Sequence, residues 1–111
     1  MNYIVHISAH GHWMDSQAGS VYRASSLETE GFIHCSRPDQ VLKVANMFYR
    51  GVPDLCLLWI APQKLESELR WEAADDDRFP HLYGTLNLDA VIAVSDFQPD
   101  PDGVYRLLPE I

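Results

Sequence analysis

The chain has 111 residues, of which 47% are hydrophobic and 11% aromatic; this length and composition predict one globular domain over residues 1–111 and exclude a disordered chain. Sixteen acidic against eight basic side chains give a formal net charge of −8. This balance argues against long nucleic acid as a partner, because surfaces that bind it normally carry a basic stripe.

The first predicted strand covers residues 3–8, a segment rich in β-branched and aromatic residues. It carries His6, which alternation places on the more polar of the two faces of the strand. A short helix is expected within residues 9–18, with Ser8 as its N-cap and Trp13 as its anchor on the sheet. The chain is therefore predicted to open with a strand followed directly by a helix.

The next segment leads from a helical turn into a second strand. Residues 26–30 are expected to form the turn, with Ser26 as its N-cap and Gly31 as its end. A strand is predicted over residues 32–35, and it places His34 near its end, just before a new helix. A strand end that faces a helix start is a common place for ligand-binding groups.

The strongest helix signal in the chain follows at residues 36–50. Ser36 is expected to be the N-cap, Pro38 suits the first turn, and apolar residues recur at helical spacing until Gly51. The start of this helix is expected to offer Ser36 as a contact for an anion. A central strand, apolar on both faces, is predicted over residues 55–60.

The second half of the chain is predicted to be mainly extended. Residues 69–72 alternate as a strand would, whereas residues 73–78 carry three consecutive aspartates and are expected to form a solvated loop. Residues 79–84 are expected to be extended between a proline and a glycine. Further strands are predicted over residues 88–97 and, as a closing hairpin, over residues 104–108.

The two cysteines indicate a reducing compartment. Cys35 and Cys56 each lie within an apolar run, so two buried, reduced thiols are expected, with a disulfide or a reactive thiol as the alternatives. Residues 1–7 lack the features of a signal peptide, and the longest apolar run, residues 55–61, is too short to span a membrane. We therefore expect a cytoplasmic protein without a membrane partner.

Polar side chains recur on the predicted strands and beside them. The set is His6, His34, Ser36, Arg70, Glu72, His81 and Tyr83. One interpretation is a site for zinc or non-haem iron, although no closely spaced ligand pair lies on a predicted strand or helix. Another is an organic-ligand site, in which imidazoles and Tyr83 bind the ligand while Glu72 stabilises charge. A third is structural, with buried histidines and an ion pair between Arg70 and Glu72.

Three short motifs resemble a family of small bacterial proteins catalogued as domain of unknown function 952. They are Gly-Phe-Ile-His-Cys-Ser at residues 31–36, Arg-Trp-Glu at residues 70–72 and Phe-Pro-His-Leu-Tyr-Gly at residues 79–84. The strand that carries His6 also fits, and the resemblance runs over residues 3–94.

That family is similar in turn to proteins of the ADP-ribosyltransferase-like fold. The resemblance implies a split β-structure that grips NAD. His6 matches the first-strand histidine, which holds the adenosine ribose, and residues 31–36 resemble the second strand. Glu72 is the counterpart of a late glutamate, which holds the ribose 2′-hydroxyl and stabilises an oxocarbenium-like centre.

We therefore predict an α+β fold of the ADP-ribosyltransferase-like type, with a mixed, strongly bent and split sheet and two or three helices. The predicted function is the binding, and the turnover, of a nucleotide-like small molecule in a cleft. The predicted catalytic residues are His6, His34 and Glu72, and the predicted ligand contacts are Ser36, Arg70, His81 and Tyr83. NAD is the expected cofactor, and no metal is expected. The alternatives are a non-catalytic binding or regulatory module and a metal-dependent hydrolase that uses the histidines.

Overall fold

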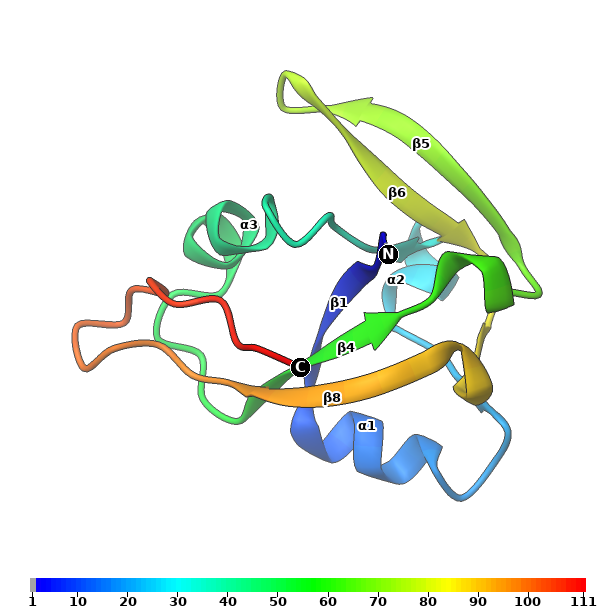
Figure 1. The fold of residues 1–111 in the computed structure, drawn as a ribbon, viewed down its shortest axis with the longest axis horizontal. Helices are drawn as coiled ribbons and strands as arrows, with labels where there is room; N and C mark the ends of the chain where they lie inside the picture. Colours follow the sequence, from blue (N-terminus) through cyan, green and yellow to red (C-terminus); the bar gives the residue numbers. More distant parts are fainter. Residues whose placement is uncertain (1) are drawn as a thin grey trace.

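The computed structural model describes residues 2–111 and arranges them in three antiparallel sheets and three α-helices (Figure 1). In chain order the helices and strands are β1 (Ile4–Ala9), α1 (His10–Ser16), β2 (Val21–Tyr22), α2 (Ser26–Thr29), β3 (Ile33–His34), α3 (Val41–Phe48), β4 (Leu55–Ile60), β5 (Glu68–Ala74), β6 (Asp77–Tyr83), β7 (Leu86–Asn87) and β8 (Val91–Phe97). Two short 3₁₀ turns, Pro62–Lys64 and Leu88–Ala90, lie between strands. Among the helices of the described chain, none is long and apolar enough to cross a membrane.

The α+β prediction with two or three helices is confirmed, but the prediction of a mixed sheet is wrong. β4 runs against both of its neighbours, β1 and β8, and β6 runs against both of its neighbours, β3 and β5. The short pair of β2 and β7 is antiparallel as well. We expected one strongly bent sheet, whereas the structure has separate antiparallel sheets.

Strand β4 is the centre of its sheet and is buried along its whole length. Its two faces contribute to two different hydrophobic clusters. Leu58 and Ile60 point into one cluster, and Leu57 and Trp59 point into the other. Each fully buried leucine contributes about 1.5–3 kcal/mol of transfer free energy. The prediction of a central strand covered on both sides is confirmed.

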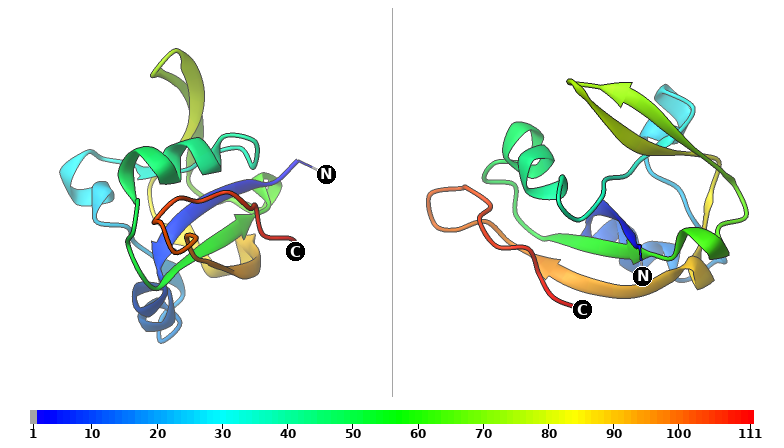
Figure 2. Two further views of the ribbon diagram at one scale, coloured as in Figure 1. Left: turned by 90° about the vertical axis from the view of Figure 1, so that its left-hand side faces the viewer. Right: turned by 45° about the horizontal axis from the view of Figure 1, so that its top comes forward.

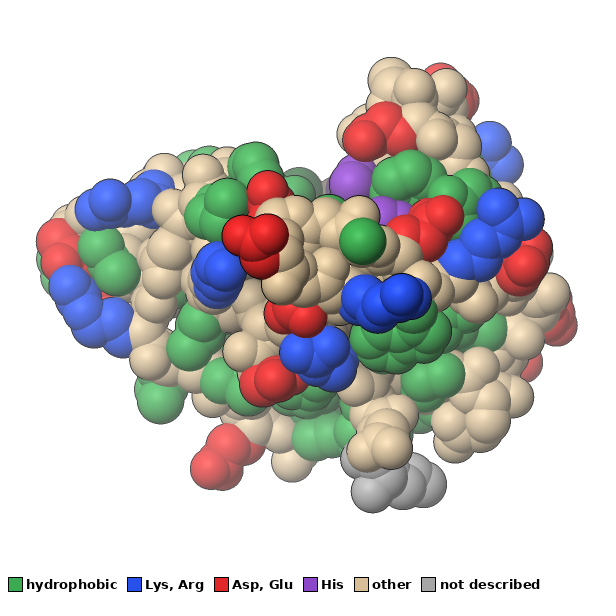
Figure 3. Space-filling model, turned by 90° about the horizontal axis from the view of Figure 1, so that it is seen from above, with side chains coloured by type: hydrophobic (Ala, Val, Ile, Leu, Met, Phe, Trp, Pro, Cys, Tyr) green, Lys and Arg blue, Asp and Glu red, His purple; other side chains and the backbone are tan. Residues whose placement is uncertain are grey.

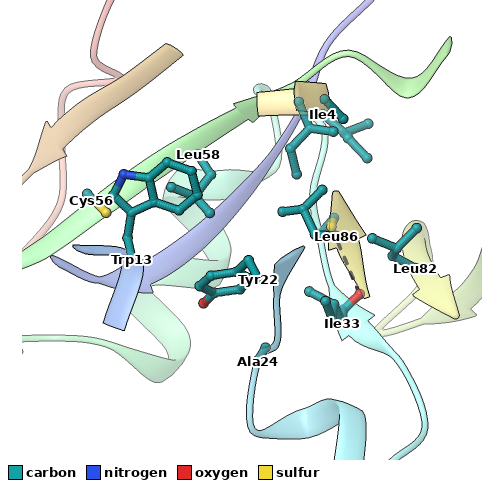
Figure 4. Close-up of a cluster of buried hydrophobic side chains, with 12 residues drawn as sticks. Ile4, Trp13, Tyr22, Ala24, Ile33, Cys56, Leu58, Leu82 and Leu86 are labelled. Carbon is teal, nitrogen blue, oxygen red and sulfur yellow. Dashed lines mark hydrogen bonds between the residues drawn. The ribbon is translucent and has the colours of Figure 1, made fainter. Parts of the chain in front are cut away.

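The first of these clusters holds the three sheets together (Figure 4). Tyr22 comes from β2, Leu58 from β4, Leu82 from β6 and Leu86 from β7, and each is at most 1% exposed. Trp13 joins them from α1, which confirms its predicted role as the anchor of that helix. Burial of these side chains fixes the position of β6 relative to β1 and β4.

A hairpin of β5 and β6 extends away from the rest of the molecule (Figures 1 and 2). Its base is held where β6 pairs with β3. The segment after β3 is in turn joined to β1 by a single bridge, in which Val5 and Ser36 exchange two backbone hydrogen bonds of 2.8 Å. The hairpin sheet and the β1-β4-β8 sheet are therefore tied at one edge and diverge from it.

The loop predicted at residues 73–78 is not a loop. β5 and β6 remain paired up to Ala74 and Asp77, and only Asp75 and Asp76 form the turn. Their φ angles, +49° and +64°, are those of a two-residue hairpin turn whose twist matches the strands. Aspartate tolerates this left-handed conformation better than most residues, so the aspartate run encodes a tight turn.

Helix α3 begins at Val41 and not at the predicted Ser36. Ser36 is occupied by its backbone bridge to Val5, and residues 37–40 form a turn instead. The Gln40 side chain accepts the Arg37 backbone N–H at 2.9 Å and so closes this turn. Ser36 therefore does not lie at the start of the helix, where it was predicted.

The N-caps predicted at Ser8 and Ser26 are also wrong. The Ser8 hydroxyl donates to the Ala9 carbonyl at 2.9 Å, and the Ser26 hydroxyl donates to the Phe32 carbonyl at 2.8 Å. Both hydroxyls thus satisfy carbonyl groups and leave the first N–H groups of α1 and α2 uncapped by side chains. The Ser26 bond holds α2 against the start of β3.

The chain after β8 has no strand, so the closing hairpin predicted at residues 104–108 is wrong. A side-chain amide takes the place of a strand partner. Asn46 of α3 accepts the Tyr105 N–H at 2.7 Å and donates to the Tyr105 carbonyl at 2.8 Å. The Tyr105 ring stacks on Phe97 with centroids 4.7 Å apart. The C-terminal segment is therefore a strap that joins α3 to the end of β8.

Candidate functional site

A cleft of about 310 Å³ opens between β1, α3 and the β5–β6 hairpin. Seen from above, histidine side chains are visible in the hollow beside the extended hairpin (Figure 3). The walls are mainly apolar. The lining residues are Val5, His6, Ile7, Glu30, Phe32, His34, Cys35, Ser36, Val44, Phe48, Tyr49, Ala74, Asp75, Phe79 and His81.

The strand register brings most of the predicted site residues to one face of the β3-β6-β5 sheet. His81 of β6 lies opposite His34 on one side and opposite Arg70 on the other. Because side chains alternate along a strand, Tyr83 and Glu72 share this face with His81. The opposite face carries Leu82 and packs on the core.

Glu72 is the centre of a hydrogen-bond cluster on this face. One of its carboxylate oxygens accepts the Tyr83 hydroxyl at 2.6 Å and the Nδ1–H of His81 at 2.8 Å. These two bonds, the Tyr83 bond first, lower the pKa of Glu72, while the bond to Glu72 raises the pKa of Tyr83. The Arg70 guanidinium lies 4.2 Å above the Tyr83 ring and pairs with Glu68 at 2.9 Å. The carboxylate is thus held in its ionised form.

His81 connects this cluster to the cleft. Its side chain is only 10% exposed, and its ring stacks on Phe32 with centroids 4.1 Å apart. Because Nδ1 donates to Glu72, the neutral ring carries its lone pair on Nε2, and within residues 2–111 that nitrogen has no hydrogen-bond partner. A carboxylate behind one imidazole nitrogen and an open lone pair on the other form an arrangement suited to accepting a proton.

His34 lies beside His81 but turns its ring in another direction. The two ring centroids are 5.5 Å apart and the rings are nearly perpendicular, at 77°. The Nε2 of His34 pairs with Glu30 at 2.9 Å, whereas His81 pairs with Glu72. The two imidazoles therefore do not converge on a common point. In the described part of the chain, no group of three His, Cys, Asp or Glu is placed to hold a metal ion.

His6 lies in the protein interior beneath His34, and both of its ring nitrogens are occupied. Nδ1 is 2.6 Å from the His34 carbonyl oxygen, which can only accept, so Nδ1 carries the hydrogen. Burial lowers the pKa of His6 to about 4, so the ring is neutral at pH 7, and its Nε2 lies 2.9 Å from the Tyr22 hydroxyl. Burial also raises the pKa of Tyr22 to about 12, and its hydroxyl donates to that of Ser8 at 2.9 Å.

The structure therefore divides the predicted site residues into two groups. His6, His34, Ser36 and His81 line the cleft. The remaining three, Arg70, Glu72 and Tyr83, lie on the same sheet face behind His81 and do not line it. Glu72 reaches the cleft only through its hydrogen bond to His81.

Both cysteines are buried and unpaired, which confirms the expectation of two buried free thiols. Burial raises the pKa of Cys35 to about 12 and that of Cys56 to about 11. Each therefore remains a thiol at pH 7, and neither is the thiolate that nucleophilic chemistry requires. Cys35 contributes to the cleft as an apolar side chain.

Sequence reasoning missed the aromatic walls and the acidic rim of the cleft. Phe32 precedes His34 by two residues, and Phe79 precedes His81 by two, so strand alternation was a signal that could have placed both on the site face. Glu30 is one residue before a glycine in the first motif and gave no such signal. The contact of Tyr22 with His6 could not be predicted from local sequence, because the two residues are 16 positions apart.

Comparison with known proteins confirms the family that the motifs indicated. The model of the family described as protein of unknown function (DUF952) matches residues 7–94. The crystal structure of protein CC0527 from Caulobacter crescentus is 33% identical, covers 95% of this chain and 94% of its own, and superposes with a TM-score of 0.86. The crystal structure of a double mutant of CC0527 is 32% identical with a TM-score of 0.86, and the solution NMR structure is 33% identical with a TM-score of 0.81. No curated protein matches the chain.

Proposed function

The chain belongs to the DUF952 family of proteins of unknown function, and we propose that it binds a small, flat organic molecule of the nucleoside type in the cleft. The observation that carries this proposal is the His81–Glu72 pair on the wall of an apolar cleft. In this proposal His81 accepts a proton from the bound molecule or from an attacking hydroxyl. The reducing environment suited to two free thiols favours a cytoplasmic location.

The size and chemistry of the cleft support a ligand of this kind. Its volume of about 310 Å³ is near the lower end for small-molecule sites, where apolar walls and a few polar groups are typical. Phe32 and Phe79 can pack against a flat ring, and His34 can form a hydrogen bond at its edge. Ser36 offers a further polar contact from the bridge segment.

Two other residues support the reacting group without touching the ligand. Glu72 orients His81 and stabilises the imidazolium that forms when Nε2 takes a proton. His6, through its 2.6 Å bond to the His34 carbonyl, holds the backbone of β3 in place. Both are positioning residues in this proposal, and Tyr83 with Arg70 fixes Glu72 in turn.

The enzymatic form of the proposal is an ADP-ribosyltransferase-like reaction with NAD. The cleft suits the nicotinamide-nucleoside end of NAD, because no lysine or arginine of residues 2–111 lines it to hold a pyrophosphate. In such a reaction the bond between nicotinamide and ribose breaks, an acceptor hydroxyl forms a new bond to the ribose carbon, and His81 takes the hydroxyl proton.

A non-catalytic binding module is the second candidate, and the position of Glu72 favours it. The resemblance implies a glutamate that touches the ribose, yet Glu72 lies behind His81 and outside the cleft lining. Consumption of NAD by the purified protein distinguishes the two. Turnover that is lost in Glu72→Gln supports the enzyme, and stable binding without turnover supports the module.

Thermal unfolding with and without nicotinamide, NAD and ADP-ribose tests the proposal. A ligand at a hundredfold excess over its dissociation constant adds about 2.7 kcal/mol of stability by mass action. We expect nicotinamide or NAD to raise the midpoint in the wild type and in His10→Ala, whose exposed side chain is outside the cleft, but not in His81→Ala. An equal rise in His81→Ala, or no rise in any protein, would contradict the proposal.

A further inference from the structure

Building on the proposed function, we infer that the part of the ligand that enters the cleft is a flat organic cation. Three features support this: the charged groups that line the cleft, its aromatic walls, and the buried, neutral His6 in its lining. The charges argue against anions, the aromatic walls argue against small metal ions, and the features together argue against a neutral ring.

The charged side chains of the lining are of one sign. Glu30 and Asp75 are the carboxylates among the lining residues, and no lysine or arginine in the described chain is one of them. Arg70, which lies opposite His81 on the neighbouring strand, is already paired with Glu68. With a net charge of −8 on the chain, the field in the cleft repels phosphates and carboxylates and attracts cations.

The walls suit a cation that is large and weakly hydrated. Four aromatic side chains line the cleft: Phe32 just before β3, Phe48 and Tyr49 at the end of α3, and Phe79 in β6. Aromatic rings attract organic cations through their quadrupoles, and such cations lose little hydration when they bind there. Small metal ions, in contrast, are bound by clusters of carboxylates. Phe48 remains 65% exposed, which is unusual for phenylalanine and provides apolar surface that a bound ring would cover.

The buried histidine of the lining adds no opposing charge to the cleft. His6 is neutral because burial lowers its pKa to about 4. A neutral flat ring would find the same walls but would gain nothing from Glu30 and Asp75. The combination therefore favours a cationic ring over a neutral ring of the same shape.

Nicotinamide and 1-methylnicotinamide provide the test, because they share a ring and differ in charge. We expect isothermal titration calorimetry to give at least a tenfold lower dissociation constant for the 1-methyl cation, and the ratio to fall as salt increases. Equal dissociation constants, or tighter binding of nicotinamide, would overturn the cation inference and leave the proposed function standing. Binding of neither compound would overturn both.

A matched pair of double variants locates the effect. Glu30→Gln with Asp75→Asn removes both carboxylates; glutamine can still accept from His34, and asparagine tolerates the φ of +49° at position 75. The control, Glu28→Gln with Asp76→Asn, removes the same charge from exposed positions outside the lining. We expect the ratio of the two dissociation constants to approach one in the first variant and to stay above five in the control. The same ratio in both variants would overturn the assignment.

Discussion

The structure contains two hydrogen-bond networks, one centred on His6 and one centred on His81. They differ in the partners of the imidazole nitrogens and in their access to the cleft. In the first, His6 is bonded to a tyrosine hydroxyl and a carbonyl, and it is buried in the lining of the cleft at 7% exposure. In the second, His81 is bonded to a carboxylate that also accepts a tyrosine hydroxyl, and its other nitrogen faces the cleft. The difference shows that residue type alone does not separate a structural histidine from a reactive one. In the proposed function the two histidines are separated by the number of ring nitrogens for which the protein already provides a partner.

This contrast also separates two parts of the fold. The closed network lies between the sheets, where Tyr22 and Leu58 fix the core. The open network lies on the hairpin sheet, whose strand β5 has no fully buried residue. His81 itself is buried on β6, whereas Glu72, which orients it, lies on the more exposed β5.

The largest expected effect is that of removing the buried histidine. His6→Ala removes the donor to the His34 carbonyl and one of the two partners of the Tyr22 hydroxyl, and it opens a cavity, so we expect a loss of about 3 kcal/mol in the free energy of unfolding. Urea unfolding measures it. His10→Ala, at an exposed position of α1, is the control and should change stability by less than about 0.5 kcal/mol. Similar losses in both variants would show that the His6 network does not stabilise the fold.

The pH dependence of stability should show the same network. His6 has a pKa of about 4 when folded against 6.5 as the ordinary value, so between these pH values the unfolded chain binds more protons. Its contribution to stability is complete above about pH 6.5 and is lost as pH falls toward 4, by about 3 kcal/mol in total. Urea midpoints across this range should therefore fall more steeply for the wild type than for His6→Ala. Parallel curves would mean that His6 titrates alike in both states.

Two tyrosine substitutions sharpen the comparison. Tyr22→Phe removes the hydroxyl beside Nε2 of His6 and the donor to the Ser8 hydroxyl, and we expect it to cost about 1–2 kcal/mol of unfolding free energy. Tyr83→Phe removes a hydroxyl of the half-exposed cluster, where water can replace it, so its cost should be clearly smaller. Because Tyr83 is the main cause of the lowered pKa of Glu72, that pKa should rise toward its ordinary value. Equal losses of stability would remove the distinction between the networks.

The smallest effect on stability is expected from the carboxylate itself, although its effect on the cleft should be clear. Glu72→Gln keeps the shape of the side chain and removes the charge behind His81, so we expect at least a severalfold weaker binding of 1-methylnicotinamide with little change in the urea midpoint. Glu68→Gln, on the same strand and paired with Arg70, is the matched control and should bind normally. Equal binding by both variants would show that Glu72 does not act through His81.

The sequence predicted those features that follow from local patterns. The apolar run of β4 identified the central strand, and alternation along β5 and β6 predicted that His81 and Tyr83 share a face. Sequence-based prediction was wrong where the same local pattern is compatible with two different structures. The serine and proline that usually start a helix here form a bridge and a turn, because Ser36 pairs with Val5. The hydrogen bonds between the Asn46 side chain and the Tyr105 backbone join residues 59 apart in sequence, so no local sequence pattern could predict them.

The division of roles between the two histidines is tested most directly by NMR of the imidazole nitrogens. In protein labelled with ¹⁵N-histidine and titrated with 1-methylnicotinamide, we expect the Nε2 resonance of His81, assigned with His81→Ala, to shift with ligand concentration. Both nitrogen resonances of His6 should stay in place, with Nδ1 protonated and Nε2 not, because the protein already satisfies them. A shift of the His6 nitrogens while those of His81 stay unchanged would contradict this account.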